Sequence, residues 1–285
     1  MEVIIGKTAG FCYGVRNAVT KAEEKVRQYK SIYCLGELVH NGEVVRKLED
    51  AGLKTIENIE EANGKVIIRA HGIPKEIYAK AEKLGIEVFD YTCPSVLKTH
   101  KIADEYAKND YFIFFIGNKQ HPETIGTVSF CGENYYVIEN LENIDEGIKR
   151  LKESNIKKLF ILAQTTFSLE KFNDFIDIIK SNLKENMDIK IENTICNATK
   201  MRQEETANLS KKVECMIIVG GKNSSNTRKL YDVSKENCGN TFLVEKKDEL
   251  NLDIIRKFKK VGIMAGASTP KESIDEIVTK LHQVS

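Results

Sequence analysis

The sequence lacks the features that would mark a membrane protein or a nucleic-acid-binding protein. It has no apolar run long enough to cross a bilayer. Its first residues, MEVIIGKTAGFCYGV, contain no basic segment followed by a long apolar core. The 43 basic and 42 acidic residues nearly cancel, so no broad field favours nucleic acid or an acidic membrane. We therefore expect a cytoplasmic protein without those partners, in which any site for an anion is local.

The sequence also contains no Cys-x-x-Cys pair, which argues against zinc ribbons and thioredoxin chemistry. It nevertheless has seven cysteines. In a reducing compartment such cysteines are metal ligands, reactive thiols or core residues more often than disulfides. The chemistry of this chain is therefore to be sought among its cysteines.

Short apolar runs alternate with charged segments of helical spacing. We expect seven buried strands, at residues 3–5, 32–35, 66–68, 111–116, 159–162, 215–219 and 261–264. Helical periodicity is clear at residues 17–29 and 169–183. This alternation predicts an α/β fold, and 285 residues suit two or three modest domains.

The pattern occurs three times along the chain. Related settings surround three cysteines: Cys12 in GFCYGV, Cys93 in YTCPSV and Cys196 in TICNAT. Twenty-eight positions after each cysteine, a Gly-containing turn follows a strand, and these positions are His40, His121 and Ser224. After the next strand come RAH, QTT and AST, which contain His71, Thr165 and Ser268. We therefore predict a triplicated unit, with boundaries at 1–92, 93–194 and 195–285.

The geometry of parallel sheets suggests where these residues meet. Loops after the carboxyl ends of parallel strands are where such sheets bind ligands. A pseudo-threefold arrangement would bring the three cysteines together, with the His, Thr and Ser positions around them. The alternative is a triplicated scaffold whose loop residues only cap helices. His-Pro-Glu and Gln-Thr-Thr carry more chemistry than capping requires.

Three cysteines suit a metal site, and their spacing alone leaves the metal open. Structural zinc usually takes four protein ligands, whereas an iron–sulfur cube with three cysteines keeps one iron open for substrate. The other four cysteines have simpler interpretations. Cys34 and Cys215 lie in apolar strands and are expected in the core. Cys131 and Cys238 lie near glycines in turns and are expected to have no role.

The ordered set GFCYGV, GELVHN, RAHG, TCP, HPE, QTT, CNAT, NSSN and GASTP resembles the 4-hydroxy-3-methylbut-2-enyl diphosphate reductases, the LytB family. The resemblance runs from residue 10 to residue 270. It implies a trefoil of three α/β units with small parallel sheets around a central [4Fe–4S] cluster. Cys12, Cys93 and Cys196 match the cluster ligands.

The resemblance also implies a reaction. The family removes the allylic hydroxyl of its diphosphate substrate with two electrons and two protons. The products are isopentenyl and dimethylallyl diphosphate, at the last step of the methylerythritol phosphate route. An electron donor such as ferredoxin or flavodoxin is implied.

Residue roles follow from the same resemblance. Glu123 matches the proton source, working with Thr165, and His121 lies near the substrate hydroxyl. Thr166 could share the role of Thr165. The other matches to the substrate pocket, which binds the diphosphate, are His40, His71, Ser224, Ser225, Asn226 and Ser268. From the residues alone, Glu123 could equally be a carboxylate that stabilises a helix N-terminus. His100 and His282 fall outside the repeat and are expected at the surface or in packing.

Two other classes of function remain open from the sequence. One is a zinc or thiol hydrolase on the same scaffold. The other is a cluster sensor or ligand-binding module without catalysis. The segment GGKNSSN lacks the Gly-Lys-Ser/Thr ending of a P-loop, so ATP is not expected.

Overall fold

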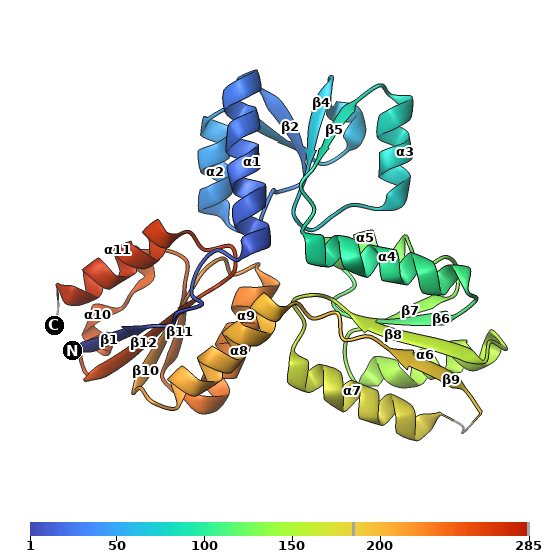
Figure 1. Cartoon of the computed structure of the whole chain (residues 1–285). Helices are drawn as coiled ribbons and strands as arrows, with labels where there is room; N and C mark the ends of the chain where they lie inside the picture. Colours follow the sequence, from blue (N-terminus) through green and yellow to red (C-terminus); the bar gives the residue numbers. More distant parts are fainter. Residues whose placement is uncertain (184–185, 284–285) are drawn as a thin grey trace. The chain divides into compact units, whose positions relative to one another are not determined.

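The computed structural model describes residues 1–183 and 186–283. Within these residues the chain forms three parallel sheets of four strands each (Figure 1). The chain divides into two compact units. The first holds one sheet and comprises Met1–Asn17, Val39–Asp50 and Asn197–Ser285. The second holds the other two sheets and comprises Ala18–Leu38 and Ala51–Cys196.

All three sheets have the same arrangement: of three strands that follow one another along the chain, the first lies between the second and the third, and a fourth strand pairs with the third. One sheet of the second unit has the order β3 (Leu53–Ile56), β2 (Ile32–Leu35), β4 (Lys65–Ile68) and β5 (Glu87–Asp90). The other has β7 (Tyr135–Ile138), β6 (Phe112–Ile116), β8 (Lys158–Ala163) and β9 (Asp188–Ile191). The sheet of the first unit has β11 (Thr241–Val244), β10 (Cys215–Val219), β12 (Lys260–Ala265) and β1 (Glu2–Ile5). The predicted α/β class with small parallel sheets is confirmed.

The first strand of the chain completes the last sheet. β1 pairs in parallel with β12, with Val3 opposite Val261, and so takes the place that β5 and β9 take in the other sheets. The predicted first unit, residues 1–92, includes this strand, whereas its hydrogen bonds belong with the strands of residues 195–285. The order of the elements along the sequence does not reveal that the first strand pairs with the last one. The remaining boundaries of the predicted units stay predictions.

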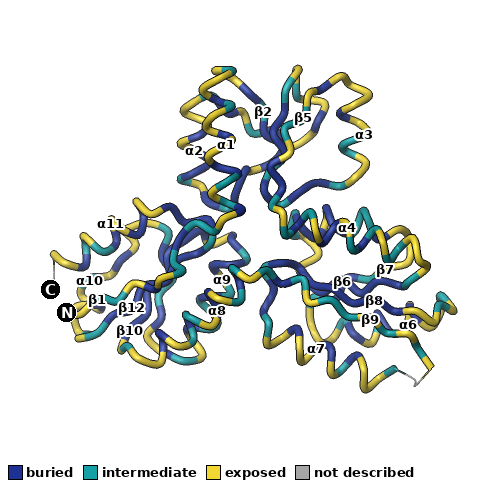
Figure 2. Tube along the Cα trace, in the orientation of Figure 1, coloured by how far each residue is buried: buried dark blue, intermediate teal, exposed yellow. Residues whose placement is uncertain are grey.

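All seven predicted strands are present, and five further strands were missed. The central strands β6 and β10 are buried along their whole length, as expected for strands covered by helices on both faces (Figure 2). Each missed strand lies at the edge of a sheet: β3, β5, β7, β9 and β11. Each of these strands has partly solvated residues, and in DIKI of β9 exposed and half-buried residues alternate. In β9 this alternation was the available signal, and a search for continuous apolar runs does not detect it. β7 (YYVI) and β11 (TFLV) are short apolar runs without charge that were overlooked.

The helices form where apolar residues recur at helical spacing. α7 (Leu169–Asn182) begins after Ser168, whose Oγ accepts the N–H of Lys171, and it buries Phe172, Phe175, Ile176 and Ile179. The other α-helices are α1 (Tyr13–Tyr29), α2 (Gly42–Asp50), α3 (Lys75–Lys83), α4 (Pro94–Lys108), α5 (Pro122–Val128), α6 (Glu142–Glu153), α8 (Asn197–Ser210), α9 (Ser225–Asn237), α10 (Leu252–Ile255) and α11 (Lys271–His282). The expected helices at 17–29 and 169–183 are confirmed, and α1 starts four residues earlier than expected. Among the described residues, no helix is long and apolar enough to cross a membrane.

Candidate active site

Apart from the cysteines, the predicted site residues lie after the carboxyl ends of the two central strands of each sheet, either in the loop or in the first turn of the helix that follows it. From the two central strands of each sheet, the chain continues to strands on opposite sides of the sheet. In α/β sheets, ligands bind at the carboxyl ends of strands where the connections diverge in this way. The first site residue of each loop comes five positions after its strand: His40 after Leu35, His121 after Ile116 and Ser224 after Val219. The repeat deduced from sequence therefore has an equal structural spacing in all three sheets.

The loop after the other central strand has a matching register. Three positions after the strand ends at Ile68, Ala163 and Ala265 come His71, Thr166 and Ser268. The sequence comparison instead aligned Thr165 with His71 and Ser268. In sequence, Thr165 and Thr166 fit the repeat equally well. The position at which β8 ends shows which of the two corresponds to His71 and Ser268. Thr165 is thus the counterpart of Ala70 and Ala267.

Each of the three predicted metal-ligand cysteines is the residue just before a helix: Cys12 before α1, Cys93 before α4 and Cys196 before α8. Their backbone N–H groups make equivalent hydrogen bonds within each sheet's loops. The acceptors are the carbonyls two positions after the central strand: Ala267 for Cys12 (3.1 Å), Ala70 for Cys93 (2.9 Å) and Thr165 for Cys196 (3.0 Å). The fold therefore holds each cysteine beside a site loop and at a helix N-terminus.

Burial separates these three cysteines from the other four. Cys12, Cys93 and Cys196 are partly exposed, whereas Cys34, Cys131, Cys215 and Cys238 are buried. Burial raises the pKa of the Cys131 and Cys215 thiols to about 12, so these stay protonated. The expected core positions of Cys34 and Cys215 are confirmed. Cys131 and Cys238 lie in loops as expected, and they also pack in the core.

Glu123 is held in the interior against Thr165. Its side chain is only 1% exposed, at the second position of α5. The Thr165 N–H donates to Oε1 at 2.6 Å, and the Thr165 hydroxyl lies 2.8 Å from Oε2. Burial raises the pKa of Glu123 to about 7, although the two hydrogen bonds from Thr165 act in the opposite direction. Glu123 is therefore a carboxyl that can hold or release a proton near neutral pH.

Two histidines lie close together in the same unit as Glu123. The rings of His71 and His121 meet edge to face, with centroids 5.5 Å apart. His121 Nδ1 accepts the backbone N–H of Glu123 at 3.2 Å and so caps α5. An accepting Nδ1 carries no proton, so the neutral ring of His121 has its N–H at Nε2.

In the first unit, polar groups gather at the start of α9. Ser224 Oγ accepts the N–H of Thr227 as the N-cap of this helix, and Ser225 is its first residue. Asn226 is 4% exposed, and neither carboxamide atom has a hydrogen-bond partner among the described residues. Ser268 Oγ donates to the His40 carbonyl at 2.9 Å. A buried amide without partners at a helix N-terminus is suited to an anionic ligand.

The structure thus brings several predicted residues together within each unit. Glu123 contacts Thr165, His71 contacts His121, and Ser268 contacts His40. Thr166 accepts a hydrogen bond from the Gln164 side chain at 2.8 Å. Cys12 belongs to the first unit, and Cys93 and Cys196 belong to the second. The meeting of the three sulfur atoms at one metal group stays a prediction.

Three residues that support the site were not predicted. Gln164 is buried, and its Oε1 accepts the Asn118 N–H at 3.1 Å, which ties together the loops after β6 and β8. Arg202 and Glu205 on α8 hydrogen-bond to the loop before Cys12. Gln164 directly precedes Thr165, and Arg202 lies six residues after Cys196. This closeness to predicted site residues was the signal in the sequence that could have identified them.

The two histidines outside the repeat have structural positions. His100 is 3% exposed and stacks on Phe130, with ring centroids 4.6 Å apart. Burial lowers the pKa of His100 to about 4, so it is neutral at physiological pH. His282 is exposed at the end of α11. The expectation of packing or surface roles is confirmed for both.

The chain is similar to known proteins over nearly its whole length. The family model described as LytB protein matches residues 3–282. A 4-hydroxy-3-methylbut-2-enyl diphosphate reductase of Clostridioides difficile is 41% identical over 287 residues, with 100% of each chain covered. A solved structure of (E)-4-hydroxy-3-methyl-but-2-enyl diphosphate reductase, called the terminal enzyme of the non-mevalonate pathway, is 40% identical, with a TM-score of 0.71 and coverage of 99% of this chain and 100% of that one. The reductase structure from Plasmodium falciparum is 30% identical, with a TM-score of 0.90 and coverage of 98% and 87%.

Proposed function

The chain belongs to the LytB protein family, and on that premise we propose that it reduces 4-hydroxy-3-methylbut-2-enyl diphosphate to isopentenyl and dimethylallyl diphosphate. The observation that carries the chemistry is the buried Glu123–Thr165 pair, a carboxyl with a raised pKa in contact with a hydroxyl. The reaction removes the allylic hydroxyl as water and consumes two electrons and two protons. Hydroxide is a poor leaving group, so its departure needs a nearby acid.

The cysteine set fits a [4Fe–4S] cluster. Three of the seven thiols are partly exposed at helix N-termini beside site loops, and the other four are buried. Three thiolate ligands suit a cluster that keeps one iron open. Held by Cys12, Cys93 and Cys196, the cluster would supply the two electrons and an open coordination position for the substrate hydroxyl.

Glu123 is the proposed proton source. When Glu123 is ionised, its Oε1 accepts the Thr165 N–H and its Oε2 accepts the Thr165 hydroxyl. When Glu123 is protonated, we place the proton on Oε2, and this hydrogen bond then runs from the carboxyl to the Thr165 hydroxyl. The Thr165 hydroxyl is then free to donate its own proton to the substrate and to take the proton of Glu123 in exchange. A pKa of about 7 leaves Glu123 substantially protonated at neutral pH while still able to release the proton.

The diphosphate is proposed to bind the polar groups that the sequence predicted for it. In the first unit these are the side chains of Ser224, Ser225, Asn226 and Ser268, with His40. Asn226 is buried at the N-terminus of α9, where the helix dipole favours negative charge. His71 and His121 are proposed donors to the substrate, and His121 would donate through Nε2–H because its Nδ1 caps α5. These local donors would allow a chain of net charge +1 to bind a strongly anionic ligand.

The electron donor and the compartment are further parts of the proposal. A ferredoxin or flavodoxin is the proposed class of donor, because the reaction needs two low-potential electrons. We propose that the protein works in the cytoplasm, where its seven cysteines stay reduced.

The direct test is an anaerobic assay with the purified chain, a chemical reductant and the hydroxylated diphosphate. We expect consumption of the substrate, formation of both products, and iron and sulfide bound in cluster proportions. A colourless protein with stoichiometric zinc would instead support a hydrolase. An iron-loaded protein that neither responds to substrate nor turns it over would support a sensor.

Cysteine substitutions refine this test. We expect Cys93→Ser to lose most of the bound iron, because serine is a weaker ligand for iron than thiolate. Cys238→Ser is the matched control, since this thiol is buried in a hydrophobic core, and the variant should retain iron at the wild-type level. Equal iron loss in both variants would contradict the proposed ligand set.

A further inference from the structure

The three cysteines are reached by loops of different length. Two residues separate Cys93 from β5, four separate Cys196 from β9, and six separate Cys12 from β1. A longer loop has more conformations to restrict, so the loop at 6–11 needs the most support if Cys12 is to be held as firmly as its counterparts.

The two shorter loops are fixed by side chains within their own neighbourhood. Asp90 Oδ1 accepts the Thr92 N–H at 2.9 Å just before Cys93. Thr194 Oγ1 accepts the Ala163 N–H at 2.9 Å two residues before Cys196. In the second loop Asn193 Oδ1 also accepts the Ile195 N–H at 3.1 Å. Each loop is thus fastened close to its cysteine by short polar side chains.

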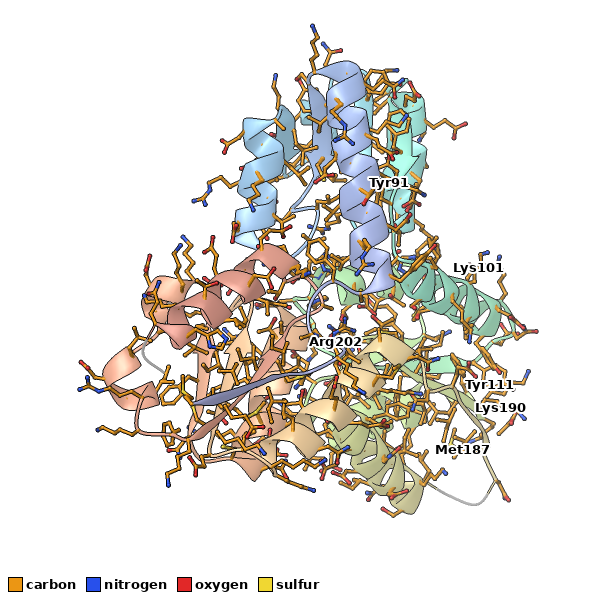
Figure 3. All side chains as sticks on the ribbon, turned by 60° about the vertical axis from the view of Figure 1, so that its left-hand side comes forward. Tyr91, Lys101, Tyr111, Met187, Lys190 and Arg202 are labelled. Atoms are coloured by element: carbon orange, nitrogen blue, oxygen red, sulfur yellow. The ribbon has the colours of Figure 1, made fainter. Side chains whose placement is uncertain are left out.

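The longest loop is held by two charged residues of α8. The Glu205 carboxylate accepts the N–H of Lys7 at 2.7 Å and that of Thr8 at 2.8 Å. Arg202 lies on the same helix, one turn earlier (Figure 3). Its Nη2 donates to the Gly10 carbonyl at 2.7 Å, two residues before Cys12.

The charges match the backbone groups that they contact. Partial burial alone would raise the pKa of Glu205, but hydrogen bonds from Thr8 and Lys7 hold the pKa below its usual value, so the carboxylate is charged. The Arg202 guanidinium is 5% exposed and also donates to the Ala198 carbonyl at 3.0 Å. Hydrogen bonds to charged groups are stronger than those between neutral groups, especially when buried.

The loop has little freedom to move away from this position. Gly10 has a φ of +96°, and a Cβ on it would lie 3.3 Å from Ile274 and 3.4 Å from the Thr269 carbonyl. The N–H of Cys12 is itself bound to the Ala267 carbonyl. Arg202 therefore binds a segment that also packs against the residues following β12.

We propose that Arg202 and Glu205 are positioning residues that fix Cys12 for metal binding. The proposal rests on the proposed function, because it assigns Cys12 as a ligand. Glu205 fixes the start of the loop through its N–H groups, and Arg202 fixes its end through a carbonyl. α8 begins at the residue that follows Cys196, which is a second proposed ligand. The helix that contains Arg202 and Glu205 is therefore joined directly to that cysteine.

The first test uses the metal-free chain. Cysteine alkylation is followed by peptide mass spectrometry, and the rate at Cys12 is divided by the rate at Cys93 within each sample. We expect Arg202→Met to raise this ratio about tenfold, because a charge-assisted hydrogen bond is lost. Glu205→Gln should raise it about threefold, since the amide keeps one acceptor oxygen. Arg202→Lys should fall between wild type and Arg202→Met, because an ammonium cannot reproduce the fork.

Two exposed positions provide matched controls: Glu204→Gln on α8 and Lys211→Met just beyond it. Both should leave the ratio unchanged. If Arg202→Met does not fold, Arg202→Lys and Glu205→Gln carry the test. An unchanged ratio in these variants, or an equal rise at Cys12 and Cys93, would overturn the proposal.

The second test measures iron release from the anaerobic holoprotein to a chelator. We expect Arg202→Met to release iron about tenfold faster than wild type, in the range found for residues that orient metal ligands. Wild-type release in a folded Arg202→Met variant would overturn the positioning role. A wild-type chain that binds no iron would overturn the proposed function itself, whereas the alkylation ratio would still test whether α8 fixes Cys12.

Discussion

The loop after β6 and the loop after β10 use one structural position for two different chemistries. Two residues after the first site residue, the β6 loop has Glu123 and the β10 loop has Asn226. Both side chains are almost completely buried at the N-terminus of a helix. Glu123 is bound by Thr165, whereas the counterpart of Thr165 in the other sheet is Ala267, which has no hydroxyl.

This difference shows how a repeated fold can separate two tasks. The carboxyl has a neighbouring hydroxyl that can relay its proton, and its burial raises its pKa to about 7. The carboxamide carries no charge, and its polar atoms are left without partners among the described residues. A carboxylate in that position would repel a diphosphate, and an amide in the first position could not supply a proton. Replacing the carboxyl of Glu123 by an amide, or the amide of Asn226 by a carboxyl, should therefore impair the protein in either case.

The largest expected effect is that of Glu123→Gln. We expect kcat to fall about 100- to 1000-fold, the range for loss of a positioned acid, with the fold and the iron content retained. Steady-state kinetics and iron analysis provide the measurement. Glu133→Gln, at an exposed loop position, is the control and should have wild-type kinetics. A near-normal kcat in Glu123→Gln would place the proton source elsewhere.

Glu123 should also make stability depend on pH. Its pKa rises from 4.5 to about 7 on folding, so between these values the folded state holds a proton that the unfolded state has lost. The stabilisation from this group is fully present below pH 4.5 and is lost as the pH rises through 7. We expect urea unfolding of the metal-free chain to show Glu123→Gln gaining about 3 kcal/mol relative to wild type between pH 4.5 and pH 8. A difference between the two chains that is constant with pH would contradict the raised pKa.

Asn226→Asp should weaken substrate binding. We expect KM to rise about 100-fold, because an anion would replace the neutral donor proposed to bind the diphosphate, while kcat changes much less. Asn226→Ala should raise KM about tenfold. Asn208→Asp repeats the chemical change at an exposed position of α8 and should leave KM unchanged. A lowered kcat with an unchanged KM in Asn226→Asp would assign this residue a different role.

The smallest expected effect distinguishes the two adjacent threonines. Thr165→Ala removes the hydroxyl next to Glu123 and should lower kcat about tenfold, the lower end of what one proton-relay group contributes. Thr165→Ser should restore most of the activity. Thr166→Ala removes a partner of Gln164 and should change kcat less than about threefold. The reverse ranking in kinetic assays would show that Thr166 is the relay.

Much of the fold could be predicted from the sequence because buried strands and helix starts have strong local signals. The runs FIFFI and CMIIV identify the fully buried strands β6 and β10. Each of the three repeat cysteines lies directly before a helix. The edge strands β3, β5 and β9 were missed because charged residues interrupt their apolar pattern, whereas β7 and β11 carry no charge and were overlooked. The pairing of β1 with β12 was missed because it joins residues about 260 positions apart.

The candidate site was predictable as a set of residues, and less so as contacts. The repeat located Glu123 and Thr165 on neighbouring loops, but it did not show that the Thr165 N–H and hydroxyl both reach the carboxyl. Nor did it separate Thr165 from Thr166, since neighbouring hydroxyls look alike in sequence. Arg202 and Glu205 were overlooked because the segment that they hold lies about 190 positions earlier in the chain.

Mössbauer spectroscopy of the anaerobically purified, iron-enriched protein is the most direct test of the account. One iron of the cluster should differ from the other three, because it lacks a cysteine ligand, and its signal alone should shift when the hydroxylated diphosphate is added. Four equivalent irons that ignore the substrate, or a preparation that contains zinc in place of iron, would contradict it.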